Sequence, residues 1–248
     1  MAVGTLGTIT SSPLNTSTAT LDFSHTVDSG TILLYLAIHM EGVEAMLAAP
    51  IWDEATANEV FTLINDSGVL SASDVRVYTY GLVNPTAKTA TIKVRLSSPG
   101  NPSWCGARNY DGCESASVAA ATNHLSDHAD TTNTDLAVHA SAGSAGNALV
   151  MSGSLQGGDG SPAAQTVGTA FTELVDANTG TTGTAEFSVW YGELLNSAPS
   201  AISVQWGVLD QHTSSFTEIV AAAVAGGGII NQLQGSNLGA DLYNGALQ

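Results

Sequence analysis

Hydrophobic and polar side chains alternate with a period of two along much of this chain. Ile92, Val94 and Leu96 are separated by Lys93 and Arg95, and residues 187–191 and 202–208 repeat the pattern. Successive side chains of a β-strand point to opposite faces of its sheet, so this alternation predicts strands with one face in a core and the other in water. Residues 31–40 are more continuously apolar, which predicts a central strand that is covered on both faces.

Further short strands are predicted from the same kind of pattern, at residues 17–24, 57–64, 74–83, 134–140, 147–155, 165–175 and 215–223. Gly, Pro, Asn and Asp cluster between them, as is typical of turns. A short helix is predicted only at 42–49, and no internal repeat of fixed period is visible. The pattern therefore predicts an all-β fold: a two-sheet antiparallel sandwich, jelly-roll-like, formed by residues 1–225.

The last segment, residues 226–248, begins with three glycines and predicts a flexible C-terminal arm. Its apolar side chains belong to no predicted strand: Ile229, Ile230, Leu233, Leu238, Leu242 and Tyr243. Such a segment either folds back on its own domain or docks on a neighbouring subunit. In the second case these six residues form part of an interface.

The charge of the chain is strongly negative and unevenly placed. Of 248 residues only 11% are charged, against roughly 25% in a typical soluble protein, and the net charge is −17. Such a surface repels nucleic acid and anionic lipid, so neither is expected as a partner. The N-terminus lacks the basic and apolar regions of a signal peptide, and no apolar run approaches the roughly 20 residues that span a bilayer.

All five basic side chains lie between residues 76 and 108, where there is no carboxylate: Arg76, Lys88, Lys93, Arg95 and Arg108. Two interpretations are open. The cations either pair with the abundant carboxylates or form a patch that meets an anionic partner. Exposed ion pairs contribute only about 0–1 kcal/mol, so the clustering favours an interface that includes Arg76, Lys93, Arg95 and Arg108.

The two cysteines, Cys105 and Cys113, are predicted to be buried free thiols. A disulfide over this spacing needs a tight reversal of the chain between them, and Asp111-Gly112 lies too close to Cys113 to provide it.

Metal-binding patterns are weak. His124 and His128 are four residues apart, but Leu125 stands where a zinc protease needs glutamate. The residues that follow read as a loop that offers oxygen ligands from Asp127, Asp130, Asn133 and Asp135. Their spacing does not match an EF-hand. A solvated acidic loop is favoured over a structural calcium site, and no metal is predicted.

Catalytic patterns are equally weak. Glu41, Glu44, Asp53 and Glu54 could supply an acid–base pair only if two of them converged across a cleft, and an acidic rim is the favoured interpretation. There is no nucleophile elbow and no phosphate-binding glycine motif. The isolated histidines His25, His39, His139 and His212 are expected to be packed or at the surface. No catalytic residue and no cofactor are predicted.

The aromatic side chains raise the alternative of a sugar-stacking platform: Trp52, Trp104, Trp190, Trp206, Tyr35, Tyr78, Tyr80, Tyr110, Tyr191 and Tyr243. Trp190 and Tyr191 are adjacent and must point to opposite faces of a strand, so at least one of them belongs to a core. Core packing is therefore favoured over a platform.

The order of segments resembles that of a group of β-sandwich structural proteins of tailed phages and marine viral metagenomes. The likeness rests on an apolar strand that ends in an acidic residue (31–41), a Tyr-x-Leu-x-Asn-Pro strand end (80–85), a Thr-rich hairpin (89–97) and a Gly-Ala-x-x-Tyr-x-Gly strand (106–112). It covers roughly residues 17–223. The cysteines and the C-terminal arm depart from the pattern.

The resemblance implies a non-enzymatic virion protein, attached to the outside of a capsid as a decoration or head-fibre protein, or to a tail. Its partners would be other virion proteins and further copies of itself, with a host glycan as an additional candidate. Such a protein assembles in the host cytoplasm and is released by lysis, which fits the absence of a signal peptide. The alternatives from other classes are a carbohydrate- or receptor-binding module and a metal-dependent glycan hydrolase.

Overall fold

The architecture comes from a computed structural model that describes residues 2–14, 18–42, 45–68, 75–97, 101–130, 137–139, 146–156, 164–166, 171–179, 187–195, 202–205 and 211–223. These residues form antiparallel strands and one short helix, α1 (Val118–Ala121), which Ser117 caps at its N-terminus. The all-β sandwich prediction is confirmed. No helix in the described part of the chain is long and apolar enough to cross a bilayer.

Residues 2–117, here called the N-terminal half, form two sheets. The N-inner sheet has the order β1-β9-β3-β7-β6 and the N-outer sheet the order β2-β8-β4-β5. Their bounds are β1 Gly4–Ser11, β2 Phe23–Thr26, β3 Leu33–Glu41, β4 Ile51–Trp52, β5 Glu59–Val60, β6 Thr62–Asp66, β7 Val75–Val83, β8 Thr89–Lys93 and β9 Ser103–Asp111. The first strand pairs with the last, the second with the second last and the third with β7, which is the wrapped pairing of a jelly roll.

Residues 118–223, the C-terminal half, repeat this topology. The C-inner sheet has the order β10-β17-β12-β15-β14 and the C-outer sheet the order β11-β16-β13. Their bounds are β10 Thr122–Asp130, β11 Ala137–His139, β12 Ala148–Gln156, β13 Ala164–Thr166, β14 Thr172–Asn178, β15 Phe187–Leu195, β16 Ile202–Gln205 and β17 Gln211–Ile219. The described chain therefore contains two jelly rolls and four sheets, where the sequence pattern predicted one sandwich of two sheets.

The equivalence of the halves extends to individual residues. β3 and β7 pair from Leu33↔Val83 to Glu41↔Val75, and β12 and β15 pair in the same way from Ala148↔Leu195 to Gln156↔Phe187. The pairing register of each edge strand shifts by one residue: β6 shifts against β7 after Leu63, and β14 shifts against β15 after Glu173. Strands β1 and β10 both contain an irregularity along the strand that they pair with. Bulges occur at defined places in a sheet, so their recurrence strengthens the equivalence.

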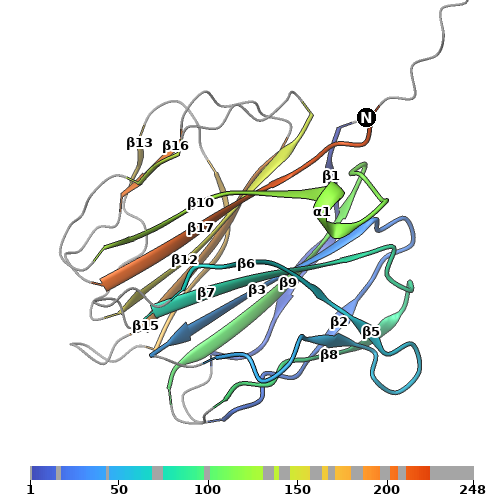
Figure 1. Ribbon diagram of the computed structural model, residues 1–248, viewed down its shortest axis with the longest axis horizontal. Helices are drawn as coiled ribbons and strands as arrows, with labels where there is room; N and C mark the ends of the chain where they lie inside the picture. The colour runs from blue at the N-terminus through green and yellow to red at the C-terminus, as the bar shows by residue number, and fades with distance from the viewer. Residues whose placement is uncertain are drawn as a thin grey trace, which may run out of the picture.

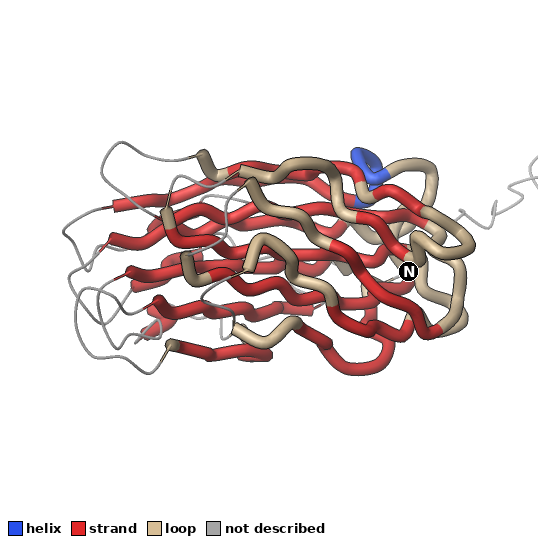
Figure 2. Tube along the Cα trace, turned by 90° about the horizontal axis from the view of Figure 1, so that it is seen from below, coloured by secondary structure: helices blue, strands red, loops and turns tan. Residues whose placement is uncertain are grey.

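The four sheets are stacked, with the two inner sheets in the middle. Figure 1 shows β13 and β16 on one side of the stack and β2, β5 and β8 on the other, and Figure 2 shows the strands running along the length of the molecule. Leu34, Leu36 and Ile38 of β3 face the N-outer sheet, while Leu33 and Tyr35 face the C-terminal half. β3 is therefore covered on both faces, as its apolar sequence predicted.

Two tryptophans pack over a glycine two residues further along the same strand. A Cβ atom at Gly106 would lie 2.2 Å from the ring of Trp104, and one at Gly192 would lie 2.2 Å from that of Trp190. Only glycine leaves room for either ring. Both tryptophans are buried, Trp104 between the halves and Trp190 on the outward face of the C-inner sheet.

The helix predicted at 42–49 is wrong for the part that the structure describes. Met46 pairs with Leu96, Leu47 donates its N–H to the Arg95 carbonyl at 3.0 Å, and Ser97 donates to the Ala45 carbonyl at 2.8 Å. Residues 45–47 thus extend the N-outer sheet beside β8. Tertiary pairing overrides the weak helical propensity of this segment.

Candidate interaction surface

Every basic side chain of the protein forms an ion pair. The pairs are Arg76–Asp66, Lys88–Asp53, Lys93–Glu54, Arg95–Asp22 and Arg108–Glu193. The first four lie within the N-terminal half, and the fifth connects the two halves. Of the two interpretations of the clustered cations, pairing with carboxylates is the one that agrees with the structure. An excess of positive charge therefore does not remain on this surface.

Lys93 and Arg95 lie on the outward face of the N-outer sheet. Their neighbours Ile92, Val94 and Leu96 point into the core, so the alternation of the sequence places the two cations in solvent. Arg95 binds both carboxylate oxygens of Asp22, and Lys93 binds Glu54. Hydrogen bonding to Asp22 is the largest of the effects that raise the pKa of Arg95.

Apolar side chains lie beside these ion pairs. Ile51 of β4 is opposite Lys93 and also opposite Val60 of β5. Leu47 lies beside Arg95, to which its backbone is hydrogen-bonded. Leu47 is 67% exposed and Val60 53%. The outward face thus has apolar side chains over the edge strand β5, β4 and the segment before β4, charged pairs over β8, and the hydroxyls of Ser24, Thr26, Thr89 and Thr91 over β2 and β8.

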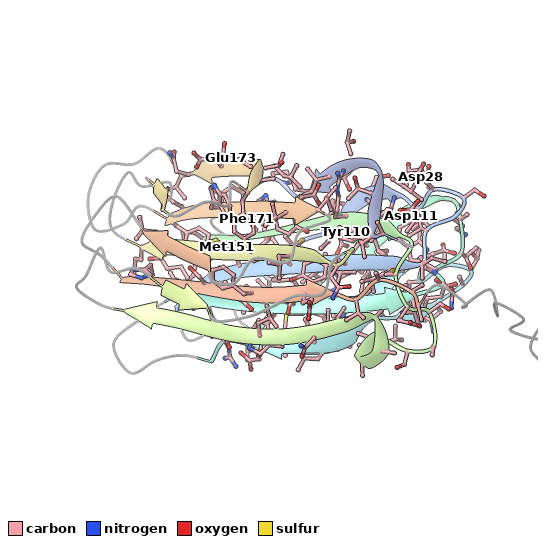
Figure 3. All side chains as sticks on the ribbon, turned by 90° about the horizontal axis from the view of Figure 1, so that it is seen from above. Asp28, Tyr110, Asp111, Met151, Phe171 and Glu173 are labelled. Carbon is pink, nitrogen blue, oxygen red and sulfur yellow. The ribbon has the colours of Figure 1, made fainter. Side chains whose placement is uncertain are left out.

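Arg108 occupies a different environment, between the two inner sheets. It is 8% exposed, and its guanidinium donates to Glu193 Oε1 at 3.0 Å and to the Gly7 carbonyl at 2.7 Å. Tyr110, labelled in Figure 3, donates to Glu193 Oε2 at 2.9 Å and lies 3.2 Å from the Tyr191 hydroxyl. Burial raises the pKa of both tyrosines well above their ordinary value, so they stay neutral and act as hydrogen-bond donors.

This burial bears on the predicted interface. Arg108 stabilises the contact between the halves and is not part of an exposed patch, because its partner comes from β15 of the same chain. For Arg76, Lys93 and Arg95 the interface stays a prediction. The other six predicted interface residues, from Ile229 to Tyr243, lie outside the described residues, as does the whole arm 226–248.

Equivalent residues of the two halves meet each other along β3 and β12. His39 and Ser154 are the seventh residues of these strands, and His39 Nδ1 lies 2.7 Å from Ser154 Oγ. Glu41 and Gln156 are the ninth residues, and Gln156 donates to Glu41 Oε1 at 2.7 Å. Contact between equivalent positions is what a two-fold axis produces. Along β3 and β12 the halves are therefore related by a local, approximate two-fold axis.

The predicted acidic loop after His124 is wrong for residues 124–130, which belong to strand β10. His124 Nε2 lies 3.3 Å from Asp127 Oδ2, and Asn65 of β6 donates to both Asp127 oxygens. Burial opposes ionisation of Asp127, but these hydrogen bonds outweigh it and lower its pKa. The side chains of His128, Asp130, Asn133 and Asp135 lie outside those described. Among the described residues, no group of three metal-binding side chains comes together.

The candidate acid–base carboxylates have separate structural partners. Glu41 accepts from Gln156, Glu54 binds Lys93, and Asp53 accepts from Thr56 and from the Ala57 N–H at 2.9 Å. Hydrogen bonding from Lys88 is the main effect that lowers the pKa of Asp53 to about 2. Asp53 thus closes the turn after β4. Glu44 lies outside the described residues.

The described aromatic residues belong to cores, as predicted. Trp52, Trp104 and Trp190 are buried, and Trp190 and Tyr191 fill cores on opposite faces of β15. Trp206 and Tyr243 are not described. Cys105 and Cys113 are free and buried, which confirms that prediction, and burial raises the pKa of each thiol to about 12.

The described histidines other than His124 are packed inside. His25 Nδ1 lies 2.5 Å from Thr10 Oγ1, and His25 Nε2 donates to Asn109 Oδ1 at 2.9 Å. His39 stands edge-on to Trp104, with ring centroids 5.2 Å apart. Burial lowers the pKa of His25 and lowers that of His39 to about 3. His212 is buried, and the side chain of His139 is not described.

Comparison with known proteins identifies no relative. No family model matches the chain, and neither a curated protein nor a solved structure matches it significantly. Function must therefore be argued from the geometry of the chain itself.

Proposed function

We propose that this protein is a non-enzymatic structural component of a tailed-phage virion, attached to the outside of the capsid as a decoration or head-fibre protein, or to the tail. It assembles in the host cytoplasm, acts with other virion proteins and leaves the cell by lysis. The sequence resemblance suggested this role, and the fold is compatible with it because jelly rolls are common in viral capsid and lectin domains.

The observation that most supports the proposal is the fusion of two jelly rolls through a fully packed interface. Leu33, Tyr35 and Ala37 of β3 pack with Ala148 and Val150 of β12, and the Arg108–Glu193 pair lies in the same layer. Such a stack is a block with one outer sheet on each side. Close packing of its two halves suits a building unit that is added to a particle.

The chemistry of the described side chains also favours a structural role. Residues that could have acted as acids or bases, such as His39, Glu41 and Glu193, are each held by a neighbour from the other half. Their polar groups join the halves together. Fold alone does not establish function, so the proposal depends on a direct test.

The test is addition of purified protein to particles of the virus that encodes it, grown without this gene. Co-sedimentation with saturable stoichiometry is the expected result, and cryo-electron microscopy would then locate the added density. A chain truncated after residue 225 is the matched comparison, because it separates attachment through the arm from attachment through the sandwich. Failure of the full chain to bind such particles, combined with specific glycan binding, would replace the proposal with the carbohydrate-binding alternative.

A further inference from the structure

We propose that the outward face of the N-outer sheet is a self-association surface that binds the same face of a second copy of this chain. The face is formed by Leu47, Ile51 and Val60 on its β4–β5 side, with the pairs Lys93–Glu54 and Arg95–Asp22 beside them. It is distinct from virion attachment, which joins this chain to a different protein.

Charge is the first reason. A chain of net charge −17 repels its own copies. On this face, however, two cations and two carboxylates neutralise one another within one surface. Elsewhere the balance is different, because residues 118–248 contain 11 carboxylates and no Lys or Arg. Two copies that meet through this face therefore bring together surfaces on which these charges cancel.

The exposed apolar side chains are the second reason. Three large apolar side chains stand out as exposed among the described residues, and two of them, Leu47 and Val60, lie on this face. Ile51 lies next to Val60 in the sheet and is only partly covered. Exposed apolar side chains next to polar and charged groups are typical of a protein–protein interface.

The presence of both signs of charge on this face explains why the partner is a second copy of the chain. A two-fold contact places the same patch on both partners, so each side must complement itself. Here Lys93 and Arg95 lie between Asp22 and Glu54, so the face carries both signs of charge and a second copy can offer a carboxylate to each cation. A purely cationic or purely anionic patch could not do this.

The size of the face sets the strength of the contact. Strands are about 4.8 Å apart and rise about 3.3 Å per residue, so a four-stranded sheet of this length presents a few hundred square ångströms. Stable dimers bury about 800 Å² on each partner. The contact is therefore weak in dilute solution and is expected to form at high local concentration.

The experiment is sedimentation equilibrium of the full chain over micromolar to millimolar concentrations. A reversible monomer–dimer equilibrium is expected. Leu47→Glu and Val60→Glu should each raise the dissociation constant at least about tenfold, because they bury a carboxylate without a partner. Leu63→Glu is the matched control: Leu63 is 49% exposed on β6, outside this face, and its equivalent in the C-terminal half is Glu173.

A chain that stays monomeric throughout this range would overturn the proposal. So would a dimer that Leu47→Glu and Val60→Glu leave unchanged, or one that Leu63→Glu weakens to the same degree, since added negative charge alone would then explain the effect. The circular dichroism spectrum and melting temperature of each variant confirm that it is folded. Particle binding is measured separately, so that loss of self-association and failure of virion attachment give different results.

Discussion

The N-terminal and C-terminal halves have the same strand pairing but very different chemistry. The N-terminal half contains all five cations and has a net charge of −6, whereas residues 118–248 have a net charge of −11. Both halves nevertheless have a bulge at the same position of the edge strand, in β6 where it pairs with β7 and in β14 where it pairs with β15. The comparison shows that backbone pairing and the core pattern determine this topology, while the charged surface is free to diverge.

The cores of the two halves have aromatic side chains at equivalent positions. Phe61 and Phe171 precede the equivalent edge strands, and each packs on the outward face of its inner sheet. Tyr78 and Trp190 are likewise equivalent in β7 and β15. Aromatic volume is conserved between the halves at these places although the individual residues differ. Packing therefore requires size and position more than identity.

The largest expected effect comes from separating the Arg108–Glu193 ion pair, which joins the halves. Arg108→Ala leaves Glu193 buried without its cation, and such changes cost about 3–5 kcal/mol. We expect that loss in the free energy of unfolding, measured with urea. Arg95→Ala, at an exposed pair, should cost less than about 1 kcal/mol. Equal losses in the two variants would show that Arg108 does not hold the halves together.

The second expected effect is on the pH dependence of stability, to which His39 contributes and its equivalent, Ser154, does not. Burial lowers the folded-state pKa of His39 from 6.5 to about 3, so between these values the unfolded chain binds a proton that the folded chain does not. Stability therefore falls as pH falls. From pH 6 to pH 4 the free energy of unfolding should drop by about 2–3 kcal/mol more in wild type than in His39→Gln. Parallel pH profiles would contradict the assignment.

The smallest effect is a difference between the two phenylalanines. Phe61→Ala and Phe171→Ala should each cost about 3–5 kcal/mol in the free energy of unfolding, with Phe61→Ala slightly the more costly because Phe61 is 2% exposed and Phe171 6%. Each variant should unfold in a single transition, since the inner sheets share one core. Two separate calorimetric transitions would mean that the halves are independent domains.

The strands with a strong apolar signal were predictable from the sequence. β3, β7 and β15 coincide with predicted strands because their apolar residues are set by burial in the cores. β10 was mistaken for a loop after His124 because its residues are mostly polar. That composition suits an edge strand, which exposes backbone groups and much of its side-chain surface to water.

The duplication was harder to see because the connections of the two halves differ in length, so no fixed period exists. A local signal was present nonetheless. Phe61-Thr62 and Asp66 recur as Phe171-Thr172 and Asp176, and the structure places them at equivalent positions around the bulges. The contacts of Arg108 and the outward face could not be inferred, because their partners depend on how the sheets stack.

The approximate two-fold axis has a consequence for what a single chain can do that a pair of identical chains cannot. In a symmetric dimer, a residue on the axis must meet its own copy, so Glu41 would face a second glutamate and the like charges would repel. Covalent fusion removes that restriction. One position keeps glutamate while its counterpart is Gln156, and repulsion becomes a hydrogen bond of 2.7 Å. The contact between like charges that symmetry would impose at this position is thereby avoided.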